Sequence, residues 1–258
     1  MKRRGFTLLE LLVVLTIIGL LAALVLSVVG SVRRKTDATQ SAHNLRTLAQ
    51  ANAAYLAENG RYVPADDKKN NRRWHGARTS AKGTFDPTKG YLADYLGNSR
   101  RVTSCPVFQK MLKGKATFEE GTGGYGYNAT YVGGTPQVRW ETDGTRISAA
   151  GGSVETPATT VMFTSAAYAR TDGVQEYPYC EPPYWDFGDG PAGFRPSPTV
   201  HFRFEGKALV AWCDGHVTFE SSQDREEGTN PHGGDATKQQ LGWFGPDENN
   251  GFWNPRKN

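Results

Sequence analysis

Residues 1–12 read Met1-Lys-Arg-Arg-Gly5-Phe6-Thr-Leu-Leu-Glu10-Leu-Leu, and the apolar run that starts at Phe6 continues to Val29. A helix over this run, at ~1.5 Å rise per residue, is longer than the roughly 30 Å hydrocarbon core of a bilayer. The apolar region of a secretory signal peptide is only roughly 7–15 residues long, so an ordinary signal peptide is disfavoured. We therefore predict that residues 6–31 form a transmembrane helix.

Glu10 is the one charged residue between Phe6 and Val29. A charge inside a membrane helix is costly and usually has a partner or a function. One interpretation is that its side chain snorkels to the headgroups, because it lies within about two helical turns of the basic residues Lys2, Arg3 and Arg4. The other is that the carboxylate has a specific partner.

The segment Arg4-Gly5-Phe6-Thr7-Leu8-Leu9-Glu10 resembles the processing site of type IV prepilins and type II secretion pseudopilins. The shared features are Gly before the cut, Phe after it, Glu as fifth residue of the mature chain, and the apolar helix that follows. The resemblance implies that residues 1–5 are a leader, that a prepilin peptidase cuts between Gly5 and Phe6, and that the Phe6 amine is N-methylated. It also implies that Glu10 serves assembly by pairing with the Phe6 amine of a neighbour, because a paired buried charge specifies register.

By the same resemblance, the chain is a structural subunit of a type IV pilus-like or type II secretion filament, and not an enzyme. Its expected partners are other pilin or pseudopilin subunits, the prepilin peptidase and the inner-membrane assembly platform, with no cofactor. The chain would be a single-pass inner-membrane protein with its head on the periplasmic side, and later part of a periplasmic or cell-surface filament. Three basic residues flank each end of the apolar run, so the positive-inside rule does not decide this orientation.

The composition of the remaining chain suits one globular domain. The 258 residues carry a formal net charge of +4, and loss of the three basic leader residues leaves +1. No basic patch with interleaved aromatic residues is present, so a nucleic-acid partner is not expected. The 30 Gly and 14 Pro residues favour a loop-rich, mainly β head over residues 61–258.

The helix is predicted to continue beyond the membrane over residues 32–60. Val32 to Asn59 contains no Pro, and apolar residues recur at three- and four-residue spacing, which predicts an amphipathic helix. Asn59-Gly60 is a good stop, because Gly readily takes the left-handed conformation after a helix. The segment from Ala53 to Pro64 also resembles the helix-to-head junction of pseudopilins. The predicted fold is α+β, a long N-terminal α-helix packed on a mainly antiparallel β-sheet.

Within the head, short strands are predicted around Tyr125–Tyr131, beside a tight turn, and at Val161–Thr164. Residues 180–198 are rich in Pro and Gly and predict an irregular, exposed loop. Asp186 and Asp189 in this loop lack the full EF-hand spacing, so we interpret them as turn-forming residues and not as calcium ligands.

A β-meander is predicted over residues 199–219. Asp214-Gly215 between apolar runs predicts a two-residue hairpin turn. That turn would pair Trp212 with Val217 and Val210 with Phe219, and bury all four on one face. A second tight turn at Glu205-Gly206 would pair His201 with Val210.

This region also resembles a branch of pilin-like proteins with a C-terminal His…Asp-Gly motif. The matching segments are Cys105-Pro106, Tyr125-Gly-Tyr-Asn128 and Asp214-Gly-His-Val217. Twelve residues separate His201 from Asp214, which is more than that branch usually has. This longer spacing puts in doubt whether His201 has the role that the histidine has in that branch.

His201, Asp214 and His216 are residue types that bind zinc. In the predicted register, however, His201 and His216 lie on opposite faces of the sheet, so no metal site is expected. No catalytic motif such as GxSxG or HExxH is present. The three cysteines, Cys105, Cys180 and Cys213, suit either one disulfide with one free thiol or three small buried side chains.

The C-terminal segment 241–255 is rich in aromatic residues. We favour a tail that folds over the head and completes its core. The alternative is a subunit contact or a carbohydrate-stacking surface. That alternative belongs to a second hypothesis for the whole protein, a membrane-tethered envelope module that recognises a glycan or peptide through its aromatic head.

Overall fold

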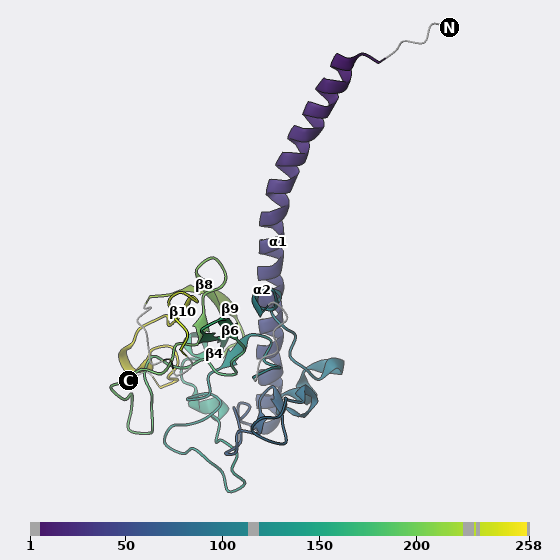
Figure 1. The fold of residues 1–258 in the computed structure, drawn as a ribbon. Helices are drawn as coiled ribbons and strands as arrows, with labels where there is room; N and C mark the ends of the chain where they lie inside the picture. The colour runs from purple at the N-terminus through teal and green to yellow at the C-terminus, as the bar shows by residue number, and fades with distance from the viewer. Residues whose placement is uncertain (1–5, 113–118, 224–229, 231–232, 257–258) are drawn as a thin grey trace. The chain divides into compact units, whose positions relative to one another are not determined.

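A computed structural model describes residues 6–112, 119–223, 230 and 233–256. It divides into two compact units, Met1–Thr39 and Gln40–Asn258. The long helix α1, Leu8–Asn59, runs through both (Figure 1). It begins two residues after the predicted start at Phe6. The α+β fold is confirmed, since the second unit contains a mainly antiparallel sheet.

Residues 8–24 of α1 expose apolar side chains on every side. Leu8 is 84% exposed and Leu20 is 66% exposed. Among the described residues, α1 is the one helix long and apolar enough to cross a membrane. A helix that is apolar all round requires an apolar environment, which lipid or neighbouring helices can supply.

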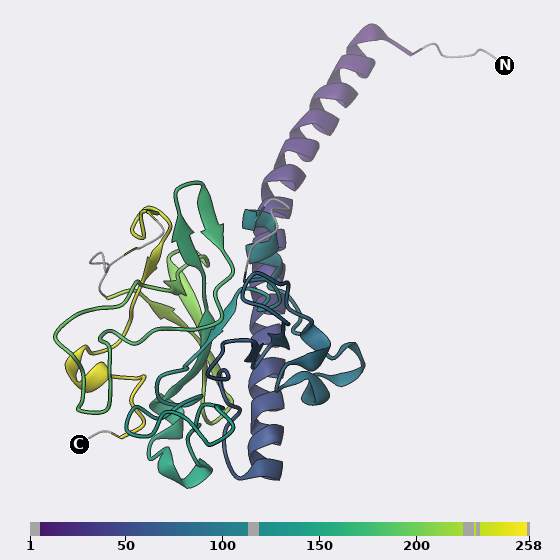
Figure 2. The same cartoon turned by 60° about the horizontal axis from the view of Figure 1, so that its bottom comes forward.

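The second half of α1, within the second unit, is amphipathic as predicted. Leu45, Leu48, Ala49 and Asn52 are buried on one face of the helix. Figures 1 and 2 show the strands of the head beside this part of α1. Gly60 ends the helix with a φ of 71°, and its N–H donates to the Leu56 carbonyl at 2.8 Å. The predicted stop is confirmed.

The central sheet of the head has four antiparallel strands in the order β3-β4-β8-β9. The predicted strand at Val161 is confirmed as β4, whereas the strand predicted around Tyr125–Tyr131 is shorter than expected, because β3 ends at Tyr127 and Tyr131 lies in a turn. The strands of this sheet are β3 (Tyr125–Tyr127), β4 (Val161–Ser165), β8 (Lys207–Trp212) and β9 (Val217–Ser221).

Three two-stranded sheets and several short helices surround this sheet. The additional strands are β1 (Arg72–Arg73) with β2 (Gly76–Ala77), β5 (Tyr168–Arg170) with β6 (Gly173–Gln175), and β7 (Val200–His201) with β10 (Leu241–Gly242). The helices are α2 (Pro106–Leu112) and the 3-10 turns Pro87–Lys89, Ala93–Tyr95, Gly97–Ser99, Gly151–Ser153, Pro157–Thr159 and Glu248–Asn250.

The C-terminal tail completes the core of the head, as predicted. Trp243, Phe244 and Trp253 are at most 1% exposed and pack in one cluster with residues of β4 and β8. Each indole N–H donates a hydrogen bond to a backbone carbonyl. The Trp253 N–H donates to the Cys180 carbonyl and the Trp243 N–H to the Pro182 carbonyl, both at 3.1 Å. Trp243, Phe244 and Trp253 are therefore not a carbohydrate-stacking surface.

The predicted register of the β8–β9 hairpin is wrong by one residue. Ala211, not Trp212, lies opposite Val217, and Val210 lies opposite Thr218. The loop has three residues, with the Trp212 N–H donating to the His216 carbonyl at 3.0 Å and the Gly215 N–H to the Trp212 carbonyl at 2.9 Å. Gly215 follows this turn in the left-handed backbone conformation, with a φ of 92°. A turn followed by such a glycine is typical of a hairpin with a G1 bulge.

The extra loop residue changes which side chains share a face. Trp212 is buried and donates from its indole to the Thr218 hydroxyl at 2.8 Å. Val217 is half-buried and Phe219 is 42% exposed, so the predicted four-residue buried face does not exist. Phe219 instead packs edge-on against Phe204, with ring centroids 5.7 Å apart.

The predicted meander is also wrong at its first strand. Glu205 and Gly206 do form a two-residue turn with positive φ, and Phe204 and Lys207 exchange two 3.0 Å backbone hydrogen bonds. The pairing stops there, because His201 in β7 lies opposite Leu241 of β10 and not opposite Val210. The second neighbour of β8 is β4, a contact between segments distant in the sequence.

Gly215→Val should destabilise the head. A Cβ at Gly215 would meet no atom within 4 Å, so the penalty comes only from holding a β-branched residue at positive φ. We expect a loss of about 1–3 kcal/mol in the free energy of unfolding. Gly193→Val is the matched control, because Gly193 is also in open space but has no positive φ. Equal melting temperatures for the two variants would contradict this account of the turn.

Candidate functional site

The predicted processing site lies at the start of α1. Gly5 is outside the described residues. Phe6 is 73% exposed, and Phe6 and Thr7 precede the first helical residue, Leu8. The backbone around Phe6 is therefore outside the helix.

Thr7 and Glu10 form a capping box. The Thr7 N–H and hydroxyl donate to Glu10 Oε2 at 2.9 and 2.8 Å, and the Glu10 N–H donates to Thr7 Oγ1 at 3.2 Å. This exchange satisfies backbone donors that the first turn of a helix leaves unpaired. The Thr-x-x-Glu spacing is the sequence signal for this box, a role that the interpretation of Glu10 as a buried charge did not include. Because Phe6 directly precedes Thr7, the box holds the carboxylate close to where a cut before Phe6 would create an amine.

The Tyr-Gly-Tyr-Asn segment is bonded to α1 and to the segment that follows it. The Tyr125 hydroxyl donates to the Ser41 carbonyl and the Tyr127 hydroxyl to the Val63 carbonyl, both at 2.9 Å. Burial raises the pKa of both phenols far above the ordinary value, so they remain donors. The Cys105 thiol lies 3.2 Å from the Ser41 hydroxyl.

Gly126 and Asn128 in the same segment have structural roles. A Cβ at Gly126 would lie 2.5 Å from the Tyr179 carbonyl oxygen, so no larger residue fits. The Asn128 amide donates to the carbonyls of Val161 and Trp253, both at 2.9 Å, and so ties β4 to the tail. The motif residues that the sequence singled out therefore position the helix, the sheet and the tail.

The three candidate zinc ligands are not assembled into a site. His201 is fully buried in β7, whereas Asp214 and His216 lie at the exposed end of the β8–β9 hairpin. His216 Nδ1 is 2.6 Å from Asp214 Oδ1, and its ring stacks on Trp212 with centroids 5.6 Å apart. Over the described ranges, no group of three or more His, Cys, Asp or Glu residues could hold a metal ion.

Asp186 forms a turn, as predicted, because its Oδ1 accepts the Gly188 N–H at 2.8 Å. The cysteines are buried and free of disulfides, in agreement with the interpretation as small buried side chains. Burial raises the pKa of Cys213 to about 12 and that of Cys180 further, so both remain as unreactive thiols.

Two buried histidines should make stability depend on pH. His75 and His201 are completely buried, and burial beside Arg73 and Arg203 lowers the pKa of each well below 6.5. Below about pH 6.5 the unfolded chain binds protons that the folded chain does not, so stability falls as pH falls. We expect a loss of up to about 1.4 kcal/mol per pH unit for each histidine between roughly pH 6.5 and 5.

Chemical unfolding at a series of pH values would measure this slope. The double variant His75→Leu/His201→Leu should flatten it. An unchanged slope in the double variant would show that other groups cause the dependence.

Comparison with known proteins gives one match. The family model for the prokaryotic N-terminal methylation motif matches residues 1–26. This match supports a type IV pilin-like or pseudopilin-like family and a prepilin-type precursor. It does not extend to the C-terminal motif segments. No curated protein and no solved structure matches the chain.

Proposed function

We propose that this pilin-type precursor is a structural subunit of a type IV pilus-like or type II secretion filament and has no enzymatic activity. The observation that carries the proposal is the methylation motif at residues 1–26, followed directly by an apolar helix whose described side chains are exposed in the single chain. Such a helix suits lipid before assembly and the helices of neighbouring subunits after assembly.

In this proposal the prepilin peptidase cuts between Gly5 and Phe6, and the Phe6 amine is methylated and keeps its charge. The position of Phe6 outside the helix supports access of a peptidase to this bond. Glu10 then pairs with the Phe6 amine of a neighbouring subunit. Two opposite charges that meet in apolar surroundings stabilise one axial register over others.

The chain would wait in the inner membrane as a single-pass protein with its head in the periplasm, and then enter a periplasmic or cell-surface filament. Its partners would be other pilin or pseudopilin subunits and the inner-membrane assembly platform. A Cβ at Gly19 would meet no atom of the described chain within 4 Å. The side of the helix at Gly19 is therefore open, which supports close packing against a neighbouring subunit. Since Gly weakens a helix by about 1 kcal/mol relative to Ala, close approach of another helix gives a reason for it.

Mass spectrometry of the mature amino terminus tests the proposal. A chain that begins at Phe6 and carries about 14 Da for one methyl group would support a filament subunit. An intact terminus at Met1 would favour the alternative, a membrane-tethered envelope module that recognises a glycan or peptide. That alternative can no longer rely on Trp243, Phe244 and Trp253, which are buried.

A further inference from the structure

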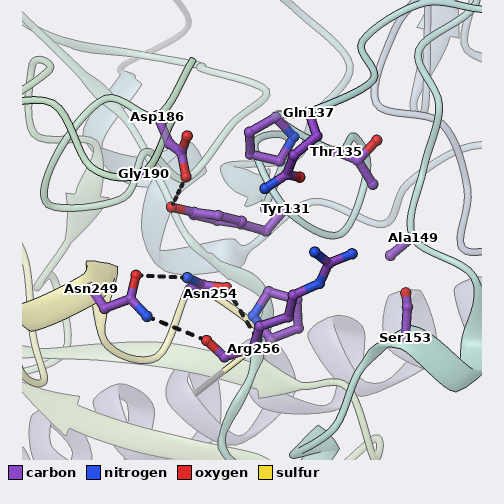
Figure 3. Close-up of a pocket in the computed structure, with 12 residues that line it drawn as sticks. Tyr131, Thr135, Gln137, Ala149, Ser153, Asp186, Gly190, Asn249, Asn254 and Arg256 are labelled. Atoms are coloured by element: carbon purple, nitrogen blue, oxygen red, sulfur yellow. Dashed lines mark hydrogen bonds between the residues drawn. The ribbon is translucent and has the colours of Figure 1, made fainter. Parts of the chain in front are cut away.

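A polar pocket opens in the second unit where four segments distant in the sequence meet (Figure 3). Its volume is about 210 Å³. The segments are residues 131–137, 149–153, 186–190 and 249–256. Most of the side chains that line it carry a hydroxyl, an amide or a charge, so it suits a polar ligand.

The wall of the pocket is held by buried hydrogen bonds. The Tyr131 hydroxyl donates to Asp186 Oδ2 at 2.8 Å and accepts from the Asn250 amide at 2.7 Å. Tyr131, Asp186 and Asn250 are each at most 5% exposed. The Asp186 carboxylate is thus already occupied by Tyr131 and by the Gly188 N–H. A satisfied network of this kind gives a binding site a fixed shape.

Two exposed polar side chains at the pocket have no such partner. Within the described part of the chain, the Gln137 amide and the Arg256 guanidinium make no hydrogen bond or ion pair, and Arg256 is bonded only through its backbone. Figure 3 shows both side chains pointing toward the middle of the pocket, near the Tyr131 ring. The pocket therefore offers one unneutralised cation and a free amide.

An exposed aromatic cluster belongs to the same loop. Trp185 and Phe187 are stacked with centroids 6.0 Å apart, and Phe194 lies 6.0 Å from Phe187. Phe187 is 52% exposed and Phe194 is 55% exposed. The pocket residue Asp186 lies between Trp185 and Phe187 in the chain, so the aromatic cluster and the pocket wall share one backbone segment.

This loop is tied to the segment 135–139, which supplies Thr135, Pro136 and Gln137 to the pocket lining. The Arg139 guanidinium covers the Phe187 ring at 5.1 Å and donates to the Asp186 carbonyl at 3.4 Å. A Cβ at Gly188 would lie 3.1 Å from the Pro136 carbonyl oxygen. Exposed aromatic surface held in a defined arrangement is typical of an interaction site.

We propose that the pocket and the Trp185, Phe187 and Phe194 cluster bind an acidic oligosaccharide. The carboxylate of one uronic-acid unit pairs with Arg256, whose planar guanidinium matches a carboxylate in a bidentate manner. The hydroxyls of that unit bond Gln137 and neighbouring polar groups, while the apolar face of an adjoining sugar ring covers the exposed phenyl rings. Side-chain amides and hydroxyls, with aromatic rings beside them, match the hydroxyls and the apolar ring faces of a sugar.

Titration of the purified full-length chain in detergent micelles with hexagalacturonate tests this inference, with cellohexaose as the neutral probe. We expect hexagalacturonate to bind more tightly. Arg256→Gln should weaken its binding about tenfold or more, and Phe187→Ala should also weaken it. Arg101→Gln is the matched control, since Arg101 is exposed but does not line the pocket, and it should leave binding unchanged.

Absence of hexagalacturonate binding, equal binding of cellohexaose, or an Arg256→Gln variant with unchanged affinity would each overturn the proposal. Arg256 and Phe187 are exposed, so their substitution should leave the melting temperature within the range of the control. The titration requires neither leader cleavage nor filaments, so its outcome is independent of the assembly function proposed above.

Discussion

Gly5→Leu should leave the protein in the membrane as its full-length precursor. Phe6 lies just outside α1, a helix long enough to span a bilayer. In the family that this segment resembles, the peptidase needs a small residue before the cut to reach the bond between Gly5 and Phe6. A leucine side chain should block access, so we expect the mature form to fall from the major species to a trace.

An immunoblot of membranes, with the intact mass of the purified protein, distinguishes precursor from mature chain. Gly5→Ala is the control, because it adds only a methyl group and should retain substantial cleavage. The membrane content of both variants should equal that of the wild type, since the apolar run is unchanged. Normal amounts of mature protein from Gly5→Leu would argue against a prepilin-type precursor.

The sequence predicted the parts of the fold that depend on local chemistry. Helix α1 follows from its apolar run, its amphipathic stripe and the stop at Gly60, and each of these operates within a few residues. The Glu205-Gly206 turn is equally local. The Asp214-Gly215 pair correctly predicted a turn, but the predicted length of two residues was wrong, because two- and three-residue loops both accept glycine at positive φ. Because the loop is one residue longer than predicted, the side chains of β9 lie on the opposite faces of the sheet from those predicted.

Contacts between distant segments were beyond prediction. Pairing of β7 with β10 and of β8 with β4 depends on the packing of the whole head, which neither turn chemistry nor alternation reveals. The buried tail tryptophans and the exposed Phe187 and Phe194 agree with the predictions of a core-completing tail and an exposed loop, but the residues that each group contacts were not predicted. Four separate segments line the pocket, so no single sequence motif could have predicted it.

Glu10→Val should abolish efficient entry into filaments while leaving cleavage and membrane insertion intact. If Glu10 pairs with the Phe6 amine of a neighbour, its function begins after processing. The valine variant should even insert more readily, because a charge has been removed from the apolar helix. Without the carboxylate, nothing neutralises the incoming amine or fixes axial register. Sheared filament yield, compared with the membrane pool by immunoblot, measures the effect.

The capping box makes a sharper comparison necessary, because Glu10→Val also removes the acceptor of the Thr7 N–H. Glu10→Gln retains a side chain that can complete the box but removes the charge, whereas Thr7→Ala retains the charge and loses the hydroxyl. If the charge acts in assembly, the glutamine variant should yield few filaments and the alanine variant nearly normal amounts. Glu10→Asp should be intermediate, because its shorter side chain carries the charge less far. The opposite pattern, with normal assembly of Glu10→Gln and failure of Thr7→Ala, would assign Glu10 to helix capping alone and contradict the proposed ion pair between subunits.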